Sequence, residues 1–317
     1  MASEIHLQTN IAIIWDFDKT LIPGYMQEPL FRHYNVDGRT FWREVNALDA
    51  HLRREGNELV ARDSLYLNHI LAHVREGIFP GLNNRLLREL GAELEFYPGL
   101  PEFFREIKDH VACKPHFRKY DIKVEHYIVS TGLRQMIMGS KIAPYVDGIW
   151  GCEFVELQLP PGYLQKKPAA AAEEDVTIKD IGYVIDNTTK TRAIFEINKG
   201  VNKNPDIDVN AHMPKEDRRI PFQNMIYIAD GPSDVPVFSL INQNGGRCFG
   251  VYAKGAREEF AQINELQKQG RIHSFGEANY KQDTQSYLWI MNAVDEIADS
   301  IAKNRDWVLT HRLGRPP

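Results

Sequence analysis

The chain has 317 residues and a net charge of −5, with 43% hydrophobic and 26% charged residues. These values are typical of a soluble globular enzyme and exclude a disordered, collagenous or membrane class of protein. The negative charge and the lack of a long Lys/Arg run argue against nucleic acid as a partner. The three cysteines are far apart and lack CxxC spacing, so we expect them to form neither a disulfide framework nor a zinc site.

The N-terminus, MASEIHLQTN, has no basic stretch followed by an apolar core. No later segment approaches the roughly 20 apolar residues that are needed to span a bilayer. We therefore expect a cytoplasmic protein that does not associate with a membrane.

A continuous apolar run rich in β-branched residues, 11–15, predicts the first strand, buried on both faces. Similar short runs recur at 123–129, 225–229 and 247–251, each followed by a turn and a plausible helix. This order predicts an α/β fold with a Rossmann-like core around a parallel sheet.

Residues 24–96 differ from the rest, because they contain helix-like segments and little strand signal. We interpret them as an inserted α-helical domain. The core would then consist of residues 1–23 and 97–317, and Pro98 and Gly99 would form the turn at the return point.

Two later segments carry structural predictions. Residues 200–224 are polar and interrupted by proline, which predicts an irregular excursion before the next buried strand. Residues 285–304 have helical periodicity. The side chains expected to align toward the core are Leu288, Met291, Val294 and Ile297.

Asp16 and Asp18 follow the first apolar run directly, in the string IAIIWDFDKTL. Strand alternation alone would place both on one side of the chain. Acidic residues are rarely left at the end of an apolar strand without a partner or a metal. A helix cap or a salt bridge is the structural alternative, and we favour a functional role for the pair.

Two further strands end in polar residues. Ser130, Thr131 and Gly132 follow the second run, where free backbone N–H groups at a helix start would suit phosphate oxygens, although a plain helix cap has the same sequence signature. Asp230 and Asp234 follow the third run and bracket a Gly-Pro-Ser turn. Open α/β sheets place their ligand crevice at the carboxyl ends of the strands, so these groups predict one shared site.

Lys190 lies near the expected start of a helix, where a cation is unfavourable to the helix dipole unless an anion is close by. A solvated surface lysine is the default alternative. Lys199 is the other candidate for a phosphate-binding lysine, but it falls near the end of the same helix, where a cation is expected for structural reasons.

In this order, the motifs resemble those of the haloacid dehalogenase (HAD) superfamily, and within it the phosphoserine-phosphatase-like phosphatases. Residues 16–20 resemble the first motif, 130–132 the second, Lys190 the third and 230–234 the fourth. The resemblance covers nearly the whole chain, and residues 24–96 match the family's helical cap domain. Two departures are Ala229, where relatives often have glycine, and the long excursion at 200–224.

The resemblance implies a Mg²⁺-dependent phosphomonoester hydrolase that acts on a small phosphorylated metabolite. Asp16 would be the nucleophile that forms an aspartyl-phosphate, and Asp18 the acid/base. The Asp16 carboxylate, the Asp18 backbone carbonyl and Asp230 would bind Mg²⁺, with Asp234 as support or an additional ligand. The expected phosphate-binding residues are Ser130, Thr131, Gly132 and Lys190.

Some alternatives stay open and others do not. The presence of Asp18 argues against carbon–halogen cleavage, and the lack of transmembrane helices argues against a P-type ATPase, which the DKT string also suggests. A phosphotransferase or phosphomutase would use the same intermediate, and a catalytically weak binding or regulatory protein could share the fold. The substrate and the oligomeric state are not predicted.

Overall fold

A computed structural model describes residues 7–157, 161–165 and 176–313. Its centre is a seven-stranded sheet in the order β4-β3-β2-β1-β5-β6-β7, in which every neighbouring pair is parallel except β3 and β4. The predicted α/β class with a Rossmann-like parallel sheet is therefore correct. The strands are β1 Asn10–Trp15, β2 Lys123–Leu133, β3 Gly148–Val155, β4 Asp180–Tyr183, β5 Met225–Ala229, β6 Arg247–Tyr252 and β7 Ser274–Glu277.

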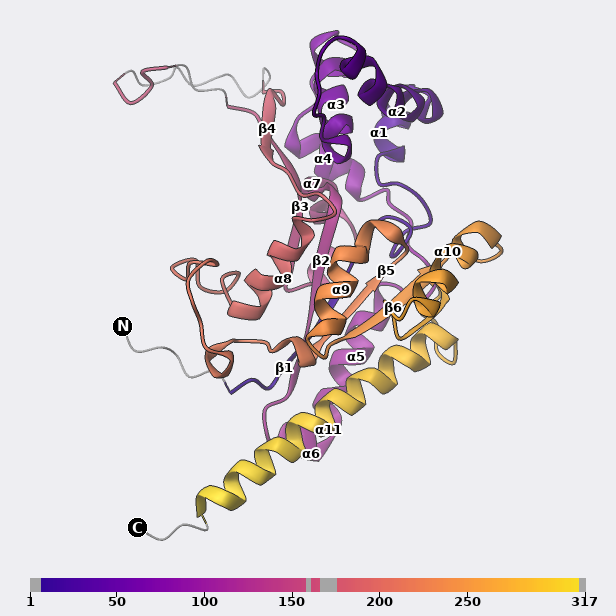
Figure 1. The fold of residues 1–317 in the computed structure, drawn as a ribbon. Helices are drawn as coiled ribbons and strands as arrows, with labels where there is room; N and C mark the ends of the chain where they lie inside the picture. The colour runs from indigo at the N-terminus through magenta and orange to yellow at the C-terminus, as the bar shows by residue number, and fades with distance from the viewer. Residues whose placement is uncertain (1–6, 158–160, 166–175, 314–317) are drawn as a thin grey trace.

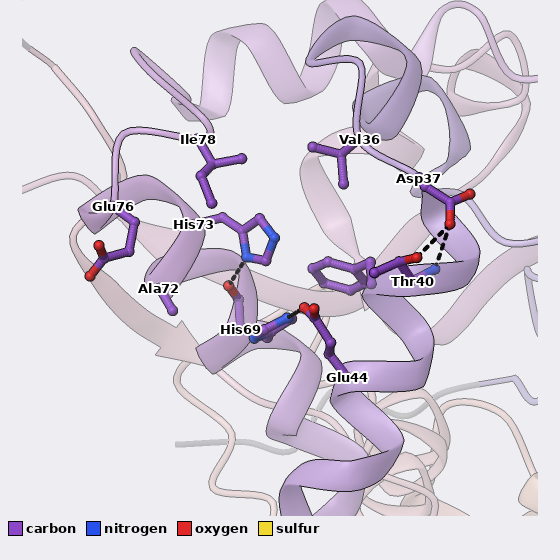
Figure 2. Close-up of a pocket in the computed structure, with 10 residues that line it drawn as sticks. Val36, Asp37, Thr40, Glu44, His69, Ala72, His73, Glu76 and Ile78 are labelled. Carbon is purple, nitrogen blue, oxygen red and sulfur yellow. Dashed lines mark hydrogen bonds and ion pairs between the residues drawn. The ribbon is translucent and has the colours of Figure 1, made fainter.

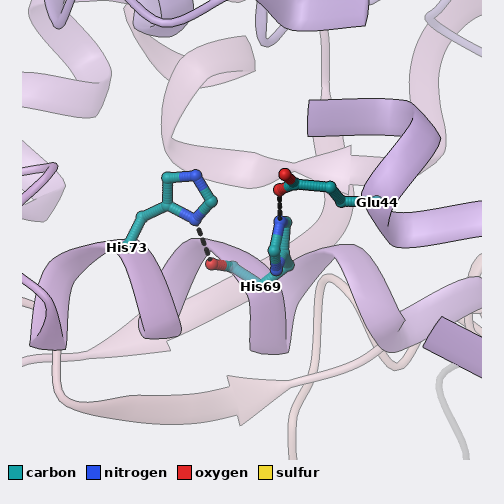
Figure 3. Close-up of side chains that lie close together, drawn as sticks. All are labelled: Glu44, His69 and His73. Carbon is teal, nitrogen blue, oxygen red and sulfur yellow. Dashed lines mark hydrogen bonds and ion pairs between the residues drawn. The ribbon is translucent and has the colours of Figure 1, made fainter. Parts of the chain in front are cut away.

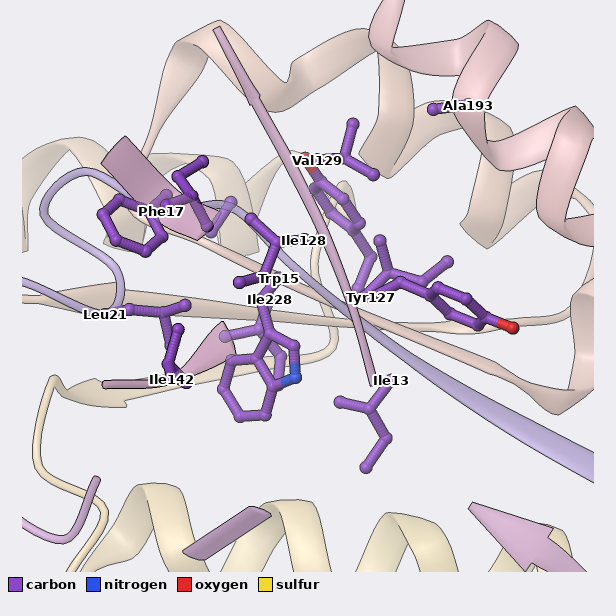
Figure 4. Close-up of a cluster of buried hydrophobic side chains, with 14 of the residues drawn as sticks. Ile13, Trp15, Phe17, Leu21, Tyr127, Ile128, Val129, Ile142, Ala193 and Ile228 are labelled. Atoms are coloured by element: carbon purple, nitrogen blue, oxygen red, sulfur yellow. The ribbon is translucent and has the colours of Figure 1, made fainter. Parts of the chain in front are cut away.

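Strand β1 lies between β2 and β5, and five of its six residues are fully buried. Its side chains alternate between the two faces of the sheet and are apolar on both, as a central parallel strand requires. Trp15 packs on Phe104 on one face, and Tyr227 of the neighbouring strand packs on Phe238 on the other. Figure 4 shows part of this core around Ile13, Trp15 and Tyr127.

Helices cover both faces of the sheet (Figure 1). One group consists of α5, α6 and α11, which contact one another, and a second group consists of α8 and α9. Helix α10 contacts β6 and β7, and α7 follows β2. The bounds are α5 Glu102–Cys113, α6 Pro115–Arg118, α7 Arg134–Gly139, α8 Lys190–Lys199, α9 Val235–Gln243, α10 Arg257–Lys268 and α11 Gln285–Leu313.

Residues 24–96 are all described and contain no strand. They form the helices at the top of Figure 1, which stand beyond one end of β2. We call this part the insert. Its helices are α1 Glu28–His33, α2 Gly38–Arg54, the short 3-10 helix η1 Arg62–Ser64, α3 Leu65–Arg75 and α4 Asn84–Gly91.

The two ends of the insert meet beside β1. The backbone N–H of Tyr97 donates to the carbonyl of Leu21 at 2.9 Å, and the rings of Phe17 and Phe96 lie 6.0 Å apart in an edge-to-face arrangement. The chain thus leaves the sheet and returns to it at neighbouring points.

Helix α4 is packed tightly against α7. A Cβ atom on Gly91 would lie 2.0 Å from the backbone oxygen of Met136, and one on Gly139 would lie 1.8 Å from that of Arg88. The two backbones therefore approach each other through glycines from both sides. This contact joins the insert firmly to the part of the chain that follows β2.

Helix α11 is longer than the helix predicted for residues 285–304, and its buried side differs from the prediction. Leu288 is 53% exposed, so its expected core position is wrong, whereas Val294 and Ile297 are buried as expected. The buried face consists of Ile290, Ala293, Val294, Ile297, Ala298 and Ile301.

Within the described ranges, no helix is long and apolar enough to cross a membrane. The first six residues, on which part of the expectation about targeting depended, lie outside those ranges. The excursion at 200–224 has little regular structure. It contains the short 3-10 helices η4 Lys215–Asp217 and η5 Phe222–Asn224.

Candidate functional site

Asp16 extends the ladder of β1 by one residue, since its backbone N–H donates to the carbonyl of Ile228 at 2.9 Å. The chain then turns, and Lys19 adopts a left-handed backbone with φ of 56°. This turn brings the Thr20 hydroxyl back to donate to Oδ2 of Asp16 at 3.2 Å. Asp16 is only 6% exposed, and specific partners hold its buried carboxylate at the end of the apolar strand.

Lys190 is the first residue of α8 and is 1% exposed. Its Nζ donates to Oδ1 of Asp16 at 2.7 Å and to Oδ1 of Asp234 at 2.6 Å. Burial disfavours the ammonium form, but the two carboxylates outweigh burial and raise the pKa of Lys190. The lysine therefore stays charged and joins the ends of β1 and β5.

Lys199, the other candidate lysine, has a different position. Its Nζ donates to the carbonyl oxygens of Val209 and Ala211 at 2.6 Å each. It thereby holds the excursion against the end of α8. Of the two lysines, Lys190 is the one that contacts Asp16.

Asp234 lies in the 3-10 helix η6 Pro232–Asp234 and is fully buried. Besides Lys190, it accepts hydrogen bonds from the hydroxyl of Tyr227 at 2.5 Å and from that of Ser233 at 2.9 Å. One ligand oxygen from each of Asp16, Asp230 and Asp234 lies within 4.8 Å of the others. Burial and the charges of the other two carboxylates raise the pKa of Asp230 well above its usual value. The group combines hard oxygen donors with excess negative charge.

Asp18 lies two residues after Asp16 and is partly buried. Its Oδ1 accepts a hydrogen bond from the backbone N–H of Met26 at 3.0 Å. Burial, followed by the charge of Asp16, raises the pKa of Asp18 to about 8. The Asp18 carboxyl is therefore able to carry a proton at neutral pH.

The Ser130–Gly132 segment differs from its prediction. We expected the strand to end here and the segment to begin a helix, but β2 continues to Leu133 and α7 begins at Arg134. A register shift against β3 occurs over this stretch. The backbone N–H of Gly132 donates to Oγ of Ser130 at 3.0 Å, so this amide is already paired. The helix start that we expected to bind an anion at this segment is therefore not present there.

A cavity of about 190 Å³ lies where the insert meets the ends of the strands. Asp18, Thr131 and Gly132 border it from the sheet, and Asn187 borders it from the loop before α8. The remaining lining residues all come from the insert: Tyr25, Gln27, Trp42, Val45, Asn46, Arg62, Asp63 and Tyr66.

Three residues of the site were not singled out from the sequence: Thr20, Tyr66 and Tyr227. Tyr227 had a signal, because a tyrosine inside a buried strand must find a partner for its hydroxyl. Tyr66 had none. Its hydroxyl donates to the backbone oxygen of Thr131, 65 positions away along the chain, at 2.7 Å.

Comparison with known proteins gives one clear relative. A protein of Borreliella burgdorferi that is described as uncharacterized is 42% identical over 287 residues, which span 90% of this chain and 96% of that protein. No model of a protein family matches the chain.

Solved structures with a similar fold are more distant. A HAD family hydrolase from Salmonella enterica serovar Typhi has a TM-score of 0.49 at 14% identity, covering 84% of this chain and 66% of its own. A probable phosphoserine phosphatase from Vibrio cholerae has a TM-score of 0.48 at 11% identity, covering 93% of this chain and 68% of its own. A phosphoserine phosphatase with a phospho-aspartyl intermediate analogue has a TM-score of 0.43 at 14% identity, covering 82% of this chain and 99% of its own. Because these scores are below 0.5, the chemistry of the site has to be argued from its own residues.

Proposed function

We propose that this chain, which belongs to the same family as the uncharacterized Borreliella burgdorferi protein, is a Mg²⁺-dependent phosphomonoester hydrolase of the HAD superfamily. The observation that carries the proposal is the buried group in which Lys190 bridges Asp16 and Asp234, with Asp18 and Asp230 beside it. These residues come from three separate parts of the sequence and match the first, third and fourth motifs on which the resemblance depends.

Asp16 would be the nucleophile. Thr20 and Lys190 each bind one of its oxygens, which fixes the orientation of the carboxylate. In the first step an oxygen of Asp16 attacks phosphorus, and the bond from phosphorus to the ester oxygen breaks. The product is an aspartyl-phosphate, and the ester oxygen leaves as an alcohol once it has received a proton.

Asp18 would supply that proton. With a pKa of about 8, its carboxyl is protonated at neutral pH and can donate to the leaving oxygen. The resulting carboxylate then accepts a proton from water, whose oxygen attacks phosphorus and displaces Asp16. Phosphate is released and both aspartates return to their starting states.

The donor set supports Mg²⁺ as the metal. Asp16, Asp230 and Asp234 offer carboxylate oxygens in one small volume, and Mg²⁺ prefers oxygen ligands. Burial and the charges of Asp16 and Asp234 raise the pKa of Asp230 even with Lys190 present, so a further cation beside these carboxylates would be favourable. Bound there, Mg²⁺ would neutralise charge on the phosphoryl group. Lys190, which contacts both Asp16 and Asp234, would add a fixed positive charge beside the nucleophile.

The insert would act as the cap that closes over the substrate. The cavity is small, at about 190 Å³, which favours a small phosphorylated metabolite over a protein or a nucleic acid. Arg62 and Asp63 contribute charged groups to its wall, and Trp42 and Tyr66 contribute aromatic ones. The part of the substrate beyond the phosphate would contact these side chains.

Phosphate release from a panel of small phosphomonoesters tests the proposal. We expect turnover with Mg²⁺, none with EDTA, and a loss in kcat on the order of 10³ or more for Asp16→Asn, because the nucleophile is removed. Lys190→Met should cause a similar loss. Lys199→Met is the matched control, since that lysine binds only backbone oxygens of the excursion, and it should retain activity. Turnover that survives Asp16→Asn, or a complete lack of turnover on the panel, would contradict the proposal.

A further inference from the structure

A second group of potential ligands lies in the insert, apart from the aspartates. Glu44 on α2 and His69 and His73 on α3 each offer one ligand atom, and the three atoms lie within 4.8 Å of one another (Figure 3). The two histidines are four residues apart and therefore share one face of their helix. We propose that these three residues form a binding site for a zinc-class divalent cation that links α2 to α3.

The hydrogen bonds of His73 prepare it to bind a metal. Its Nδ1 lies 2.8 Å from the backbone oxygen of His69, and since a carbonyl only accepts, Nδ1 carries the proton. The lone pair is then on Nε2. A metal-binding histidine typically donates its other ring N–H to a backbone carbonyl or a carboxylate in this way, which fixes both tautomer and ring orientation.

The spacing of the other two ligands also fits. Nε2 of His69 lies 2.9 Å from Oε2 of Glu44. Tetrahedral zinc with bonds of about 2.0–2.1 Å separates its ligands by about 3.3 Å. The pair has to open by a few tenths of an ångström, and no other separation in the group, each within 4.8 Å, has to shorten by more than about 1.5 Å.

The surroundings leave room for a fourth ligand. Figure 2 shows the three side chains facing a pocket of about 480 Å³ between α2 and α3. His73 is 8% exposed, whereas the Glu44 side chain is 51% exposed, so an ion can enter from the side of Glu44. A water molecule from the pocket would complete the coordination.

The ligand types separate this site from the aspartate group. Two imidazole nitrogens and one carboxylate form a donor set that zinc uses in proteins, whereas Mg²⁺ takes oxygen ligands. The alternative role for the histidines is structural. Phe41 packs on His69 at 4.9 Å between ring centroids and Phe79 on His73 at 4.8 Å, and Glu44 would then pair with His69 without a metal.

Metal titration of the full chain decides between the two roles. The protein is first treated with EDTA, then dialysed into excess Mg²⁺ to cover the aspartates, and titrated with Zn²⁺ and, separately, with Co²⁺. We expect one tightly bound equivalent of Zn²⁺, a rise in melting temperature on binding, and visible absorption from Co²⁺ bound by nitrogen and oxygen in tetrahedral geometry.

Variants locate the site. Glu44→Gln and His69→Gln should each lower the Zn²⁺ affinity at least about tenfold and abolish the thermal shift, because each removes a direct ligand. Glu44 is half exposed, so its substitution keeps the protein folded even where a change at the buried His73 does not. Glu76→Gln is the matched control, as Glu76 lines the same pocket without belonging to the group, and it should bind like the wild type. A wild type that does not bind Zn²⁺ would overturn the proposal. So would Glu44→Gln and His69→Gln variants that bind Zn²⁺ as tightly as the wild type does.

Discussion

His126 is a fully buried histidine with a structural role beside β1. Its Nδ1 accepts a hydrogen bond from the indole of Trp15 at 3.2 Å, and its Nε2 donates to the backbone oxygen of Phe104 at 3.0 Å. The ring also stacks on that of Phe104, with centroids 4.3 Å apart. These contacts require the neutral ring. Burial, with the nearby Lys108 ammonium, lowers the pKa of His126 to about 3.

This histidine makes stability depend on pH. In the unfolded chain it titrates near 6.5, so between about pH 6.5 and 3 the unfolded state binds the additional proton. Its contribution is therefore complete above pH 6.5 and is lost as the pH falls. We expect the difference in free energy of unfolding between the wild type and His126→Gln to shrink by about 1.4 kcal/mol per pH unit from 6.5 to 4.

Urea denaturation at several pH values measures this difference. The comparison with the variant is needed because the raised pKa of Asp18 makes the free energy of unfolding increase as the pH falls. This contribution is the same in both proteins and cancels in the difference. The exposed His51 provides the control, and His51→Gln should follow the wild type at every pH. A difference that does not change with pH would show that His126 is not held neutral.

At the scale of elements, the contact between α4 and α7 requires glycine at the two positions where the backbones approach each other. A methyl group at Gly139 would overlap the backbone of Arg88, and a backbone cannot rotate away as a side chain can. We expect Gly139→Ala to lower the free energy of unfolding by about 1–3 kcal/mol through overpacking. The urea midpoint reports this loss. Gly24→Ala is the control, since its added Cβ would meet nothing within 4 Å, and equal midpoints for the two variants would refute the role of the contact.

The elements that could be predicted from the sequence are those with strong local patterns. The runs at 11–15 and 225–229 are apolar, β-branched and bounded by turn residues, and they became β1 and β5 almost residue for residue. The end of β2 could not be predicted, because Ser130–Gly132 suits both a strand and a helix start. Whether the segment forms a strand or a helix start depends on its pairing with β3, which is a tertiary contact. Leu288 was placed wrongly because it faces away from the buried side of α11, although Ser286 and Ile290 on either side of it are buried.

The residues of the candidate site also fall into those that could be predicted from the sequence and those that could not. Asp16, Asp18, Asp230 and Asp234 could be found because they follow strands, and parallel strands deliver their carboxyl ends to one edge. The sequence favoured Lys190 over Lys199 from their positions on the helix, but only the packing of the helix decides which end faces β1, so Lys199 stayed open as the alternative. The spacing of His69 and His73 places both on one helix face, but their grouping with Glu44 could not be predicted, because it depends on how α2 packs against α3.

At the scale of the whole molecule, the hydrogen bond of Tyr66 is one of those that join the insert to the sheet beside the cavity. The Tyr66 hydroxyl is buried and donates to the Thr131 backbone oxygen at 2.7 Å. A bond of this kind contributes about 0.5–1.5 kcal/mol. If the insert closes over the substrate, Tyr66→Phe should raise KM roughly two- to tenfold, which steady-state kinetics on the best ester of the panel would measure.

Tyr34 provides a matched control for this change. Its hydroxyl donates to the backbone oxygen of Pro80 at 2.9 Å, a bond that lies wholly within the insert. Tyr34→Phe therefore removes the same kind of interaction without touching the junction, and its KM should equal that of the wild type. An unchanged KM for Tyr66→Phe would mean that this junction does not govern closure.

The bond between Tyr97 and Leu21 has a consequence for how such a molecule can change over evolutionary time. Because the backbones of Leu21 and Tyr97 are only a hydrogen bond apart, a segment of a different length could connect β1 to α5 across this point. Lengthening, shortening or exchanging that segment leaves Asp16 in place at the end of β1. Under the proposed function, the sheet would keep its reaction while successive inserts present it with new molecules to act upon.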